Sequence, residues 1–373
     1  MSGNHARFRK LSPGDPAPWF TGRETNNPSY MFDTAAGRYI VLCFFGSSQD
    51  PRAQQIFSEV QVTHRALFDE ERCAFFGVSA DPRDEAQQRL QANLPGIRFF
   101  YDTNLAISRL YGVAPMDTPA DGQVTVLCRW FVLDPTLRII KVVPFRQDGQ
   151  DQAEVLDFLQ KLPPVGRFAG IEIQAPVLYL PDVFEPELCQ ELIELYRRNG
   201  GTDSGFMRDV NGRTVTIKDY GRKSRRDYTV VEEPVLKEVN GRILRRIHPE
   251  IKKVHQFVVT RIERHLIACY SAEDKGHFAA HRDDTTLGTA HRRFAVTINL
   301  NHAFEGGELN FPEYGPRSFK PPPGGAVVFS CSLLHKVTQV TKGERFAFLP
   351  FLYDEAARKV REANAHYLET AEK

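Results

Sequence analysis

Short apolar runs alternate with polar stretches over roughly the first 160 residues. Residues 39–46 (YIVLCFFG) and 73–80 (CAFFGVSA) are almost wholly apolar, which is typical of strands covered on both faces. The polar stretches 51–68 and 81–91 have helical patterns, while 97–102 and 129–145 predict further strands, the latter two strands around an Asp-Pro turn. Alternating strands and helices predict an α/β fold with a mixed sheet.

A different pattern follows in the second half. A strand signal at 175–184 is followed by amphipathic helical patterns at 185–200 and 232–254. From Val254 onward, short strand-like runs are separated by Gly and Pro turns, which predicts an α+β domain: a double-sheet jelly roll with supporting helices. The Pro- and Gly-rich stretch 159–184 is the expected connection, which gives domains 1–165 and 166–373.

Composition narrows the function classes. A chain of 373 residues with 42% apolar content is long enough for two cores, and a formal net charge of +1 favours neither a nucleic acid nor a membrane as partner. No apolar run reaches membrane-span length and the start has no signal-peptide core, so we expect a cytoplasmic protein. The six cysteines are far apart, without a CxxC pair, and are expected to be buried and reduced.

The order of elements over about residues 10–162, with LSPGDPAPWF before the first strand and FVLDPTLRII near the end, resembles the thioredoxin fold in its peroxiredoxin form. In that family the reactive cysteine follows the first central strand, where this chain has Gly46 to Arg52. A CxxC motif laid over this segment would place its sulfurs at Gln49 and Arg52. The resemblance therefore implies a thioredoxin-like domain that is redox-inactive and has a docking or regulatory role, with a protein as its candidate partner.

The candidate chemistry lies between Tyr270 and Arg345. His281 and Asp283 are one residue apart and His335 follows a predicted strand; two histidines and one carboxylate can occupy one face of an iron(II) ion. Residues at i and i+2 project to the same side, and we expect His335 to approach from the opposing sheet. Arg345 offers a fork suited to a dicarboxylate, and the pair Gly306 and Gly307 predicts a tight turn and a close backbone approach.

The segments GHFAAHRDD, FEGGELNF and LLHKVTQVTKGERFAF, in this order, resemble the iron(II)- and 2-oxoglutarate-dependent oxygenases of the prolyl 4-hydroxylase-like branch. The resemblance implies that His281, Asp283 and His335 bind Fe(II), and that Arg345 and Tyr270 hold the distal carboxylate of 2-oxoglutarate. It further implies dioxygen as co-substrate, ascorbate as a candidate reductant, and hydroxylation of a protein, peptide or amino-acid-like substrate with release of succinate and CO2. Prolyl 4-hydroxylases commonly have lysine at the position of Arg345, which puts proline as the substrate in doubt.

Alternatives stay open at this stage. His277 with His281 has metal-binding helical spacing but lacks the glutamate of a zinc protease, and His291, His302 or Asp284 could replace a ligand. Tyr270 could be a core residue, and we expect the basic cluster Arg222, Lys223, Arg225 and Arg226 to be solvated surface. At the level of function, the alternatives are a non-catalytic adaptor and a thiol peroxidase that uses Cys43, Cys73 or Cys128.

Overall fold

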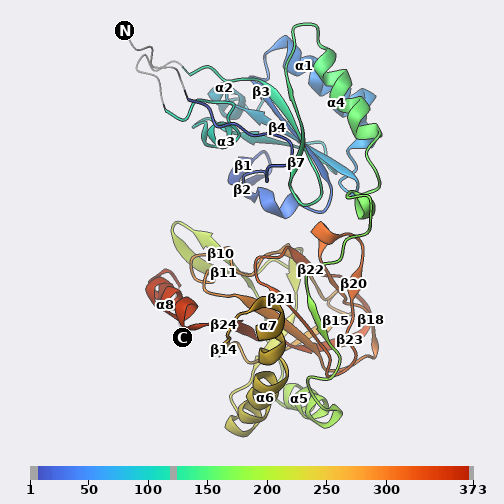
Figure 1. Cartoon of the computed structure of the whole chain (residues 1–373), viewed down its shortest axis with the longest axis vertical. Coiled ribbons are helices and arrows are strands. Elements are labelled where there is room, and N and C mark those ends of the chain that lie inside the picture. Colours follow the sequence, from blue (N-terminus) through green and yellow to red (C-terminus); the bar gives the residue numbers. More distant parts are fainter. Residues whose placement is uncertain (1–6, 118–123, 369–373) are drawn as a thin grey trace. The chain divides into compact units, whose positions relative to one another are not determined.

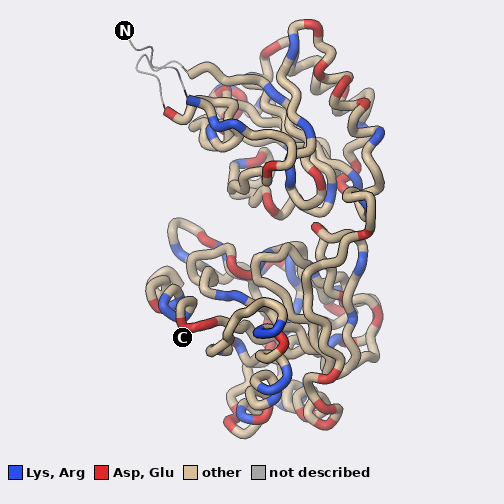
Figure 2. The backbone as a smooth tube through the Cα atoms, viewed as in Figure 1, with Lys and Arg blue, Asp and Glu red and all other residues tan. Residues whose placement is uncertain are grey.

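The computed structural model describes residues 7–117 and 124–368, which form two compact units (Figure 1). The first extends along the chain to Gln174 and also includes Pro312–Gly315; the second comprises Ala175–Phe311 and continues from Pro316. The change from one unit to the other thus falls between Gln174 and Ala175, later along the chain than the boundary at residue 165 expected from the sequence. Basic and acidic residues are interspersed along the backbone of both units (Figure 2), as the near-zero net charge suggests.

A seven-stranded sheet forms the centre of the described part of the first unit, in the order β2-β1-β5-β4-β3-β6-β7. The central strands β3, β4 and β5 are parallel, and the flanking pairs are antiparallel. Its strands are β1 Thr21–Glu24, β2 Asn27–Met31, β3 Tyr39–Gly46, β4 Cys73–Ser79, β5 Ile97–Tyr101, β6 Arg129–Leu133 and β7 Ile139–Pro144. Its helices are α1 Pro51–Ser58, α2 Pro82–Ala86, α3 Ala106–Leu110 and α4 Gln150–Gln160.

Burial on both faces explains why β3 is apolar along almost its whole length. Val41, Cys43 and Phe45 pack in one core cluster with residues of α1 and α4. Phe44 points to the other face, where its ring contacts those of Tyr111 and Phe131. The strand predictions are confirmed by the structure, whereas the helix predicted over 81–91 is wrong in length because α2 ends at Ala86 and Gln88 has a left-handed backbone.

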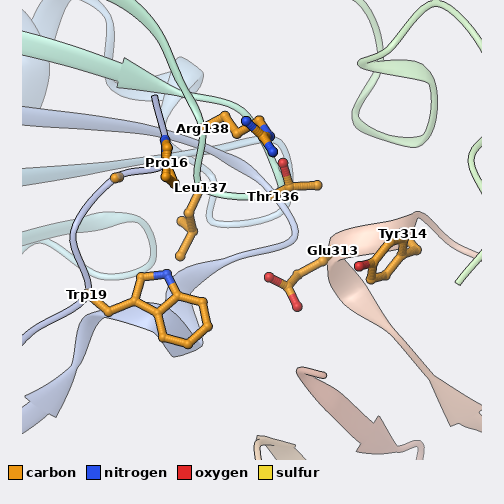
Figure 3. Close-up of a pocket in the computed structure, with 8 residues that line it drawn as sticks. Pro16, Trp19, Thr136, Leu137, Arg138, Glu313 and Tyr314 are labelled. Atoms are coloured by element: carbon orange, nitrogen blue, oxygen red, sulfur yellow. The ribbon is translucent and has the colours of Figure 1, made fainter. Parts of the chain in front are cut away.

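The first unit also has a hollow that is separate from the position of the family's reactive thiol. Pro16, Trp19, Thr136, Leu137 and Arg138 lie around it (Figure 3), and half of the Trp19 surface is exposed. The lining also includes Glu313 and Tyr314 of the segment Pro312–Gly315, which belongs to the same unit, so the hollow contains a carboxyl group.

Two antiparallel sheets form the main part of the second unit within the described residues. The larger runs β14-β24-β17-β23-β15-β13-β9, with β21 on β17, β8 on β21 and β18 on β23; the smaller runs β12-β16-β22-β19-β20. The strands of the larger sheet are β8 Leu178–Leu180, β9 Thr202–Asp203, β13 Arg226–Thr229, β14 Arg261–Glu263, β15 Leu266–Ser271, β17 Phe294–Asn299, β18 Phe304–Gly306, β21 Ala326–Ser330, β23 Val340–Phe348 and β24 Phe351–Tyr353. Those of the smaller sheet are β12 Lys223–Ser224, β16 His277–His281, β19 Leu309–Asn310, β20 Ser318–Phe319 and β22 His335–Val337, and β10 Phe206–Val210 with β11 Arg213–Ile217 forms a separate hairpin.

Helices support the larger sheet through a shared apolar core. They are α5 Pro186–Asn199, α6 Glu233–Arg246 and α7 His248–His255, and α8 Glu355–Asn364 follows the last strand. Leu192 of α5, Val239 of α6 and Ile251 of α7 are fully buried in one cluster with Ile267 of β15 and Phe348 of β23. The predicted double-sheet architecture with helical support is confirmed, and the polar residues of β16, β17, β22 and β23 are left to line the site.

Candidate metal and co-substrate site

The three predicted metal ligands come together at neighbouring strands of the smaller sheet. His281 is the last residue of β16, His335 is the first of β22, and the two are directly paired across these antiparallel strands. Asp283 lies two residues beyond β16, where its backbone N–H donates to the carbonyl of Cys331. The expectation that His335 approaches from the opposing sheet is wrong: the turn after β21 brings the chain from the larger sheet into the sheet that holds His281.

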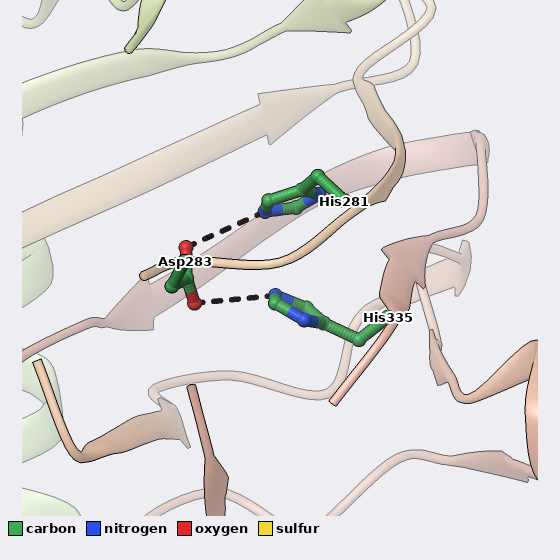
Figure 4. A group of neighbouring side chains, drawn as sticks. All are labelled: His281, Asp283 and His335. Carbon is green, nitrogen blue, oxygen red and sulfur yellow. Dashed lines mark ion pairs between the residues drawn. The ribbon is translucent and has the colours of Figure 1, made fainter. Parts of the chain in front are cut away.

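Figure 4 shows both imidazole rings facing the Asp283 carboxylate, each toward one of its two oxygens. His281 Nε2 lies 3.6 Å from Asp283 Oδ1, and His335 Nε2 lies 3.4 Å from Asp283 Oδ2. One ligand atom from each of the three residues lies within 4.8 Å of the others. This is the donor set, with open positions left for other ligands, that non-haem iron(II) sites use.

Backbone carbonyls fix which ring nitrogen of each histidine is free. Nδ1 of His281 is 2.8 Å from the carbonyl of Ala279, and Nδ1 of His335 is 3.0 Å from that of Leu333. A carbonyl only accepts, so each Nδ1 carries a proton, and in the neutral ring each Nε2 keeps its lone pair. Such outer partners orient metal-bound histidines and raise their basicity.

The protonation states also suit a metal ion. Burial opposes the charge of Asp283, but the adjacent His335 and His281 together hold the pKa of this carboxyl well below its usual range. Burial and the proximity of His281 lower the pKa of His335 to about 4. At neutral pH the site therefore presents an ionised carboxylate and a neutral His335, the forms that bind metals.

Aromatic side chains enclose the histidines. Phe278 stacks on His281 with ring centroids 3.5 Å apart, and Phe329 lies edge-on to His335 at 4.7 Å. Phe278 and Phe329 are themselves buried. These contacts restrict both rings and keep water away from one side of the site.

Arg345 lies in the larger sheet on β23 and is 2% exposed. Its Nε donates to Asn299 Oδ1 and its Nη2 donates to Thr297 Oγ1, two polar residues that alternate along the otherwise apolar β17. Nη1 is buried without a hydrogen-bond partner. An unpaired buried donor on a guanidinium is costly unless an anion completes it, so Arg345 fits a carboxylate ligand.

Gly307 makes room for this arginine. It has a φ of +63°, and a Cβ added there would lie 3.2 Å from Arg345 Cδ and 2.7 Å from Val340 Cγ2. The close approach expected at the Gly306–Gly307 pair is confirmed: Gly306 lies against the carbonyl of Gln339, and Gly307 lies against the side chains of Val340 and Arg345.

Tyr270 is 1% exposed and pairs directly with Arg345 across β15 and β23. The Arg345 guanidinium lies 5.3 Å from the centre of the Tyr270 ring. Tyr270 and Arg345, the two residues predicted to bind the co-substrate, therefore lie together in one buried group.

The rival ligands are held elsewhere. His277 bonds to the carbonyls of Lys275 and Gly221, and His291 bonds to Glu263. His302 is exposed and Asp284 bonds to Ser332. Within the described ranges, the group with metal-ligand geometry consists of His281, Asp283 and His335.

The basic cluster of residues 222–226 is only partly on the surface. Arg226 is exposed as expected, but the expectation of solvated surface is wrong for Lys223 and Arg225, which are 5% and 8% exposed. Arg225 donates to the Tyr270 hydroxyl and pairs with Asp227. The signal that could have revealed it is the alternation of basic residues along 222–226, which places Lys223 and Arg225 on one face of an extended segment.

In the first unit, the loop that precedes α1 carries no thiol. Asp50 caps α1 by accepting from the Arg52 backbone N–H. Burial raises the pKa of Cys73 to about 12 and that of Cys128 to about 11, and it raises that of Cys43 well above the usual range. All six cysteines are free thiols, five of them buried.

Comparison with known proteins supports both resemblances. Residues 13–142 match the AhpC/TSA family. The C-terminal part is similar to a PKHD-type hydroxylase of Synechococcus sp. (strain JA-2-3B'a(2-13)), with 24% identity over 178 residues that cover 46% of this chain and 75% of the relative. A PKHD-type hydroxylase of Paracoccus denitrificans is 26% identical over 182 residues, with the same coverage of 46% and 75%.

Among solved structures, a prolyl-4-hydroxylase of Pseudomonas putida is similar over 49% of this chain and 94% of its own, with 14% identity and a TM-score of 0.37. The chain thus joins an AhpC/TSA-like, thioredoxin-type unit to a relative of PKHD-type hydroxylases, as the sequence motifs predicted. Among the described residues, no helix combines the length and the apolar character needed to cross a membrane.

Proposed function

We propose that the second unit is an iron(II)- and 2-oxoglutarate-dependent dioxygenase that hydroxylates a protein, peptide or amino-acid-like substrate. Its relatedness to PKHD-type hydroxylases supports an enzyme of this class. The observation that carries the proposal is the convergence of three ligand atoms within 4.8 Å, and the buried Arg345 with its unpaired Nη1 supports it.

In this proposal His281, Asp283 and His335 hold the metal, and Arg345 with Tyr270 binds the distal carboxylate of 2-oxoglutarate. When bound, iron(II) and 2-oxoglutarate supply the oxidising chemistry, with succinate and CO2 as products. The chain's own residues orient the ligands, exclude water through Phe278 and Phe329, and neutralise the co-substrate through Arg345. Ascorbate is a candidate reductant.

The direct test measures iron(II)-dependent conversion of 2-oxoglutarate to succinate by the purified full chain, with cell extract as the substrate source. We expect activity in the wild type, its loss in His281→Ala and a reduction in Arg345→Ala, with Arg345→Lys retaining part of it. The exposed His302→Ala is the matched control and should behave as the wild type. Succinate formation that persists in His281→Ala would refute the assignment of His281 as a metal ligand. A wild type that forms no succinate and binds neither iron nor 2-oxoglutarate would favour the non-catalytic adaptor.

We infer that the first unit is redox-inactive and serves to bind a protein partner. The raised pKa values of Cys43, Cys73 and Cys128 support the absence of redox activity, because a nucleophilic cysteine needs a lowered pKa. A thiol with a pKa near 11 is ionised in about one molecule in ten thousand at neutral pH. Rapid labelling of the native protein by a thiol reagent, together with peroxide consumption, would contradict the inference, and the urea-unfolded chain with its six cysteines is the positive control.

The absence of disulfides among free, mostly buried cysteines agrees with a reducing compartment, and we infer a cytoplasmic location from it. Expression of a tagged full-length chain followed by cell fractionation tests this inference.

A further inference from the structure

Tyr270 lies between two buried guanidinium groups. The Arg225 Cζ is 5.6 Å from its ring centre and the Arg345 Cζ is 5.3 Å from it. Tyr270, Arg225 and Arg345 are 1%, 8% and 2% exposed, so water does not compete for their hydrogen bonds. The orientation of the Tyr270 hydroxyl is therefore set by protein groups.

Arg225 makes the Tyr270 hydroxyl oxygen an acceptor. Its Nη1 donates to the Tyr270 oxygen at 3.2 Å, and its Nη2 donates to Asp227 Oδ2 at 2.7 Å and to Ser204 Oγ at 3.3 Å. A guanidinium has only donors, so the phenol oxygen is the acceptor and its own hydrogen must point elsewhere. None of the residues that the structure describes accepts this hydrogen.

The Tyr270 O–H and Arg345 Nη1 thus remain without acceptors in one buried place, where Arg225 Nε is a further unpaired donor. The two residues are paired across adjacent antiparallel strands, which sets their side chains next to each other. Two adjacent donors match the two oxygens of one carboxylate.

Asp227 secures Arg225 in this role. Although burial opposes the charge, Asp227 and Tyr270 hold the pKa of Arg225 above its usual range, so its guanidinium stays protonated. The side chain of Arg225 is 5% exposed and that of Asp227 is 13% exposed. The ion pair between Arg225 and Asp227 therefore lies below the surface and holds the Arg225 side chain in place.

We propose that Arg225 is a positioning residue for co-substrate binding: by occupying the Tyr270 oxygen, it turns the Tyr270 O–H toward the distal carboxylate of 2-oxoglutarate held by Arg345. This inference rests on the function proposed above. Arg225 acts through Tyr270 and selects for a carboxylate at the far end of the co-substrate.

The test uses the full chain with iron(II) under anaerobic conditions and follows the visible absorbance of the iron-bound 2-oxo acid. Each protein is titrated with 2-oxoglutarate and with 2-oxopentanoate, which has a methyl group in place of the distal carboxylate. The variants are Arg225→Gln, Tyr270→Phe and the double variant, and the neighbouring, exposed Arg226→Gln is the matched control.

We expect Arg225→Gln and Tyr270→Phe each to weaken 2-oxoglutarate binding at least about tenfold, while 2-oxopentanoate binding changes less than about twofold. The double variant should be no weaker than Tyr270→Phe, because Arg225 acts through the missing hydroxyl. Arg226→Gln should match the wild type. Arg225→Lys, which keeps one charged donor, should recover part of the lost affinity and serves if Arg225→Gln does not fold.

If Arg225→Gln weakens the binding of both 2-oxo acids equally, Arg225 only supports the fold. If the losses of affinity add up in the double variant, Arg225 does not act through Tyr270. Either outcome overturns the proposal. A wild type that binds both ligands, with Arg225→Gln unchanged, refutes this inference alone. A wild type that gives no absorbance change with either ligand refutes the proposed function, and this inference with it.

Discussion

At the scale of single residues, Gly307 shows how closely the backbone approaches the co-substrate arginine. A Cβ at this position would meet Val340 at 2.7 Å and Arg345 at 3.2 Å, and its φ of +63° disfavours other residues. We predict that Gly307→Ala displaces Arg345 and weakens 2-oxoglutarate binding about tenfold, while iron binding is unchanged. The measurement is the anaerobic titration of the iron(II) protein with 2-oxoglutarate.

Gly212→Ala is the control that distinguishes the effect of backbone strain from the effect of lost space at Gly307. Gly212 has a similar φ of +76°, but a Cβ there would meet nothing within 4 Å. We expect its co-substrate affinity to equal that of the wild type. Equal losses in both variants would mean that displacement of Arg345 is not the cause.

Glu263 is the residue from which we expect an acid-dependent contribution to stability. Burial opposes its charge, but the hydrogen bond from His291 and the charge of Arg292 lower its pKa to about 2 from a usual value of 4.5. Because the folded-state pKa is depressed, the stabilisation is complete above about pH 4.5 and is lost as the pH falls toward 2. It amounts to at most about 3 kcal/mol.

We predict that Glu263→Gln is less stable than the wild type at neutral pH, and that the difference shrinks as the pH falls toward 3, about the middle of this range. Urea unfolding over a pH series measures it, with the exposed Glu305→Gln as control. A difference that does not depend on pH would contradict the assignment to Glu263.

At the scale of elements, a carboxylate organises the loop between β3 and α1, the place of the reactive cysteine in peroxiredoxin-like proteins. Asp84, fully buried in α2, accepts from the Ser48 N–H at 2.8 Å and from the hydroxyls of Ser48 and Ser79 at 2.6 Å, and it pairs with Arg89 at 3.4 Å. The loop is therefore built as a structural network.

Removing this carboxylate should destabilise the first unit. We predict that Asp84→Ala lowers the free energy of unfolding by about 2–4 kcal/mol, because it leaves the buried N–H and hydroxyl of Ser48 without their acceptor. Urea denaturation measures the loss, and Asp148→Ala, at an exposed acid, should cost little. A change in the Asp84→Ala variant no larger than in the control would refute the role of the network.

Much of the element order was predictable because local pattern determines it. The run 39–46 coincides with β3, since burial on both faces demands an apolar residue at nearly every position. The helix after Asp81 was overestimated because its polar pattern continues past Ala86, while the left-handed Gln88 redirects the chain. That redirection depends on contacts that no local pattern contains.

The site was predictable where spacing in the sequence carries the chemistry, as for His281 and Asp283. The role of Arg225 was not predictable, because a short basic segment looks the same whether water or Tyr270 receives its hydrogen bonds. Its burial depends on β13, which pairs Arg226 with Cys269 next to Tyr270. Such contacts join residues that are far apart in the sequence.

At the scale of the whole molecule, the two units should respond differently to ligands. A ligand that binds only the folded state stabilises it by about 2.7 kcal/mol at a hundred times its dissociation constant. We predict two calorimetric transitions for the full chain, with manganese(II) and 2-oxoglutarate raising only that of the second unit. His281→Ala should abolish this shift, and a shift of both transitions, or of the first unit alone, would contradict the prediction.

The pairing of His281 with His335 across β16 and β22 has a consequence for the durability of the chain. An ion held by both would act as a removable crosslink, closing a long loop that contains β17 and β21. A crosslink of this kind restricts local opening as well as unfolding. Proteolytic nicking between the two histidines should therefore become slower as iron becomes available, so that the lifetime of the protein reports on the supply of its own metal.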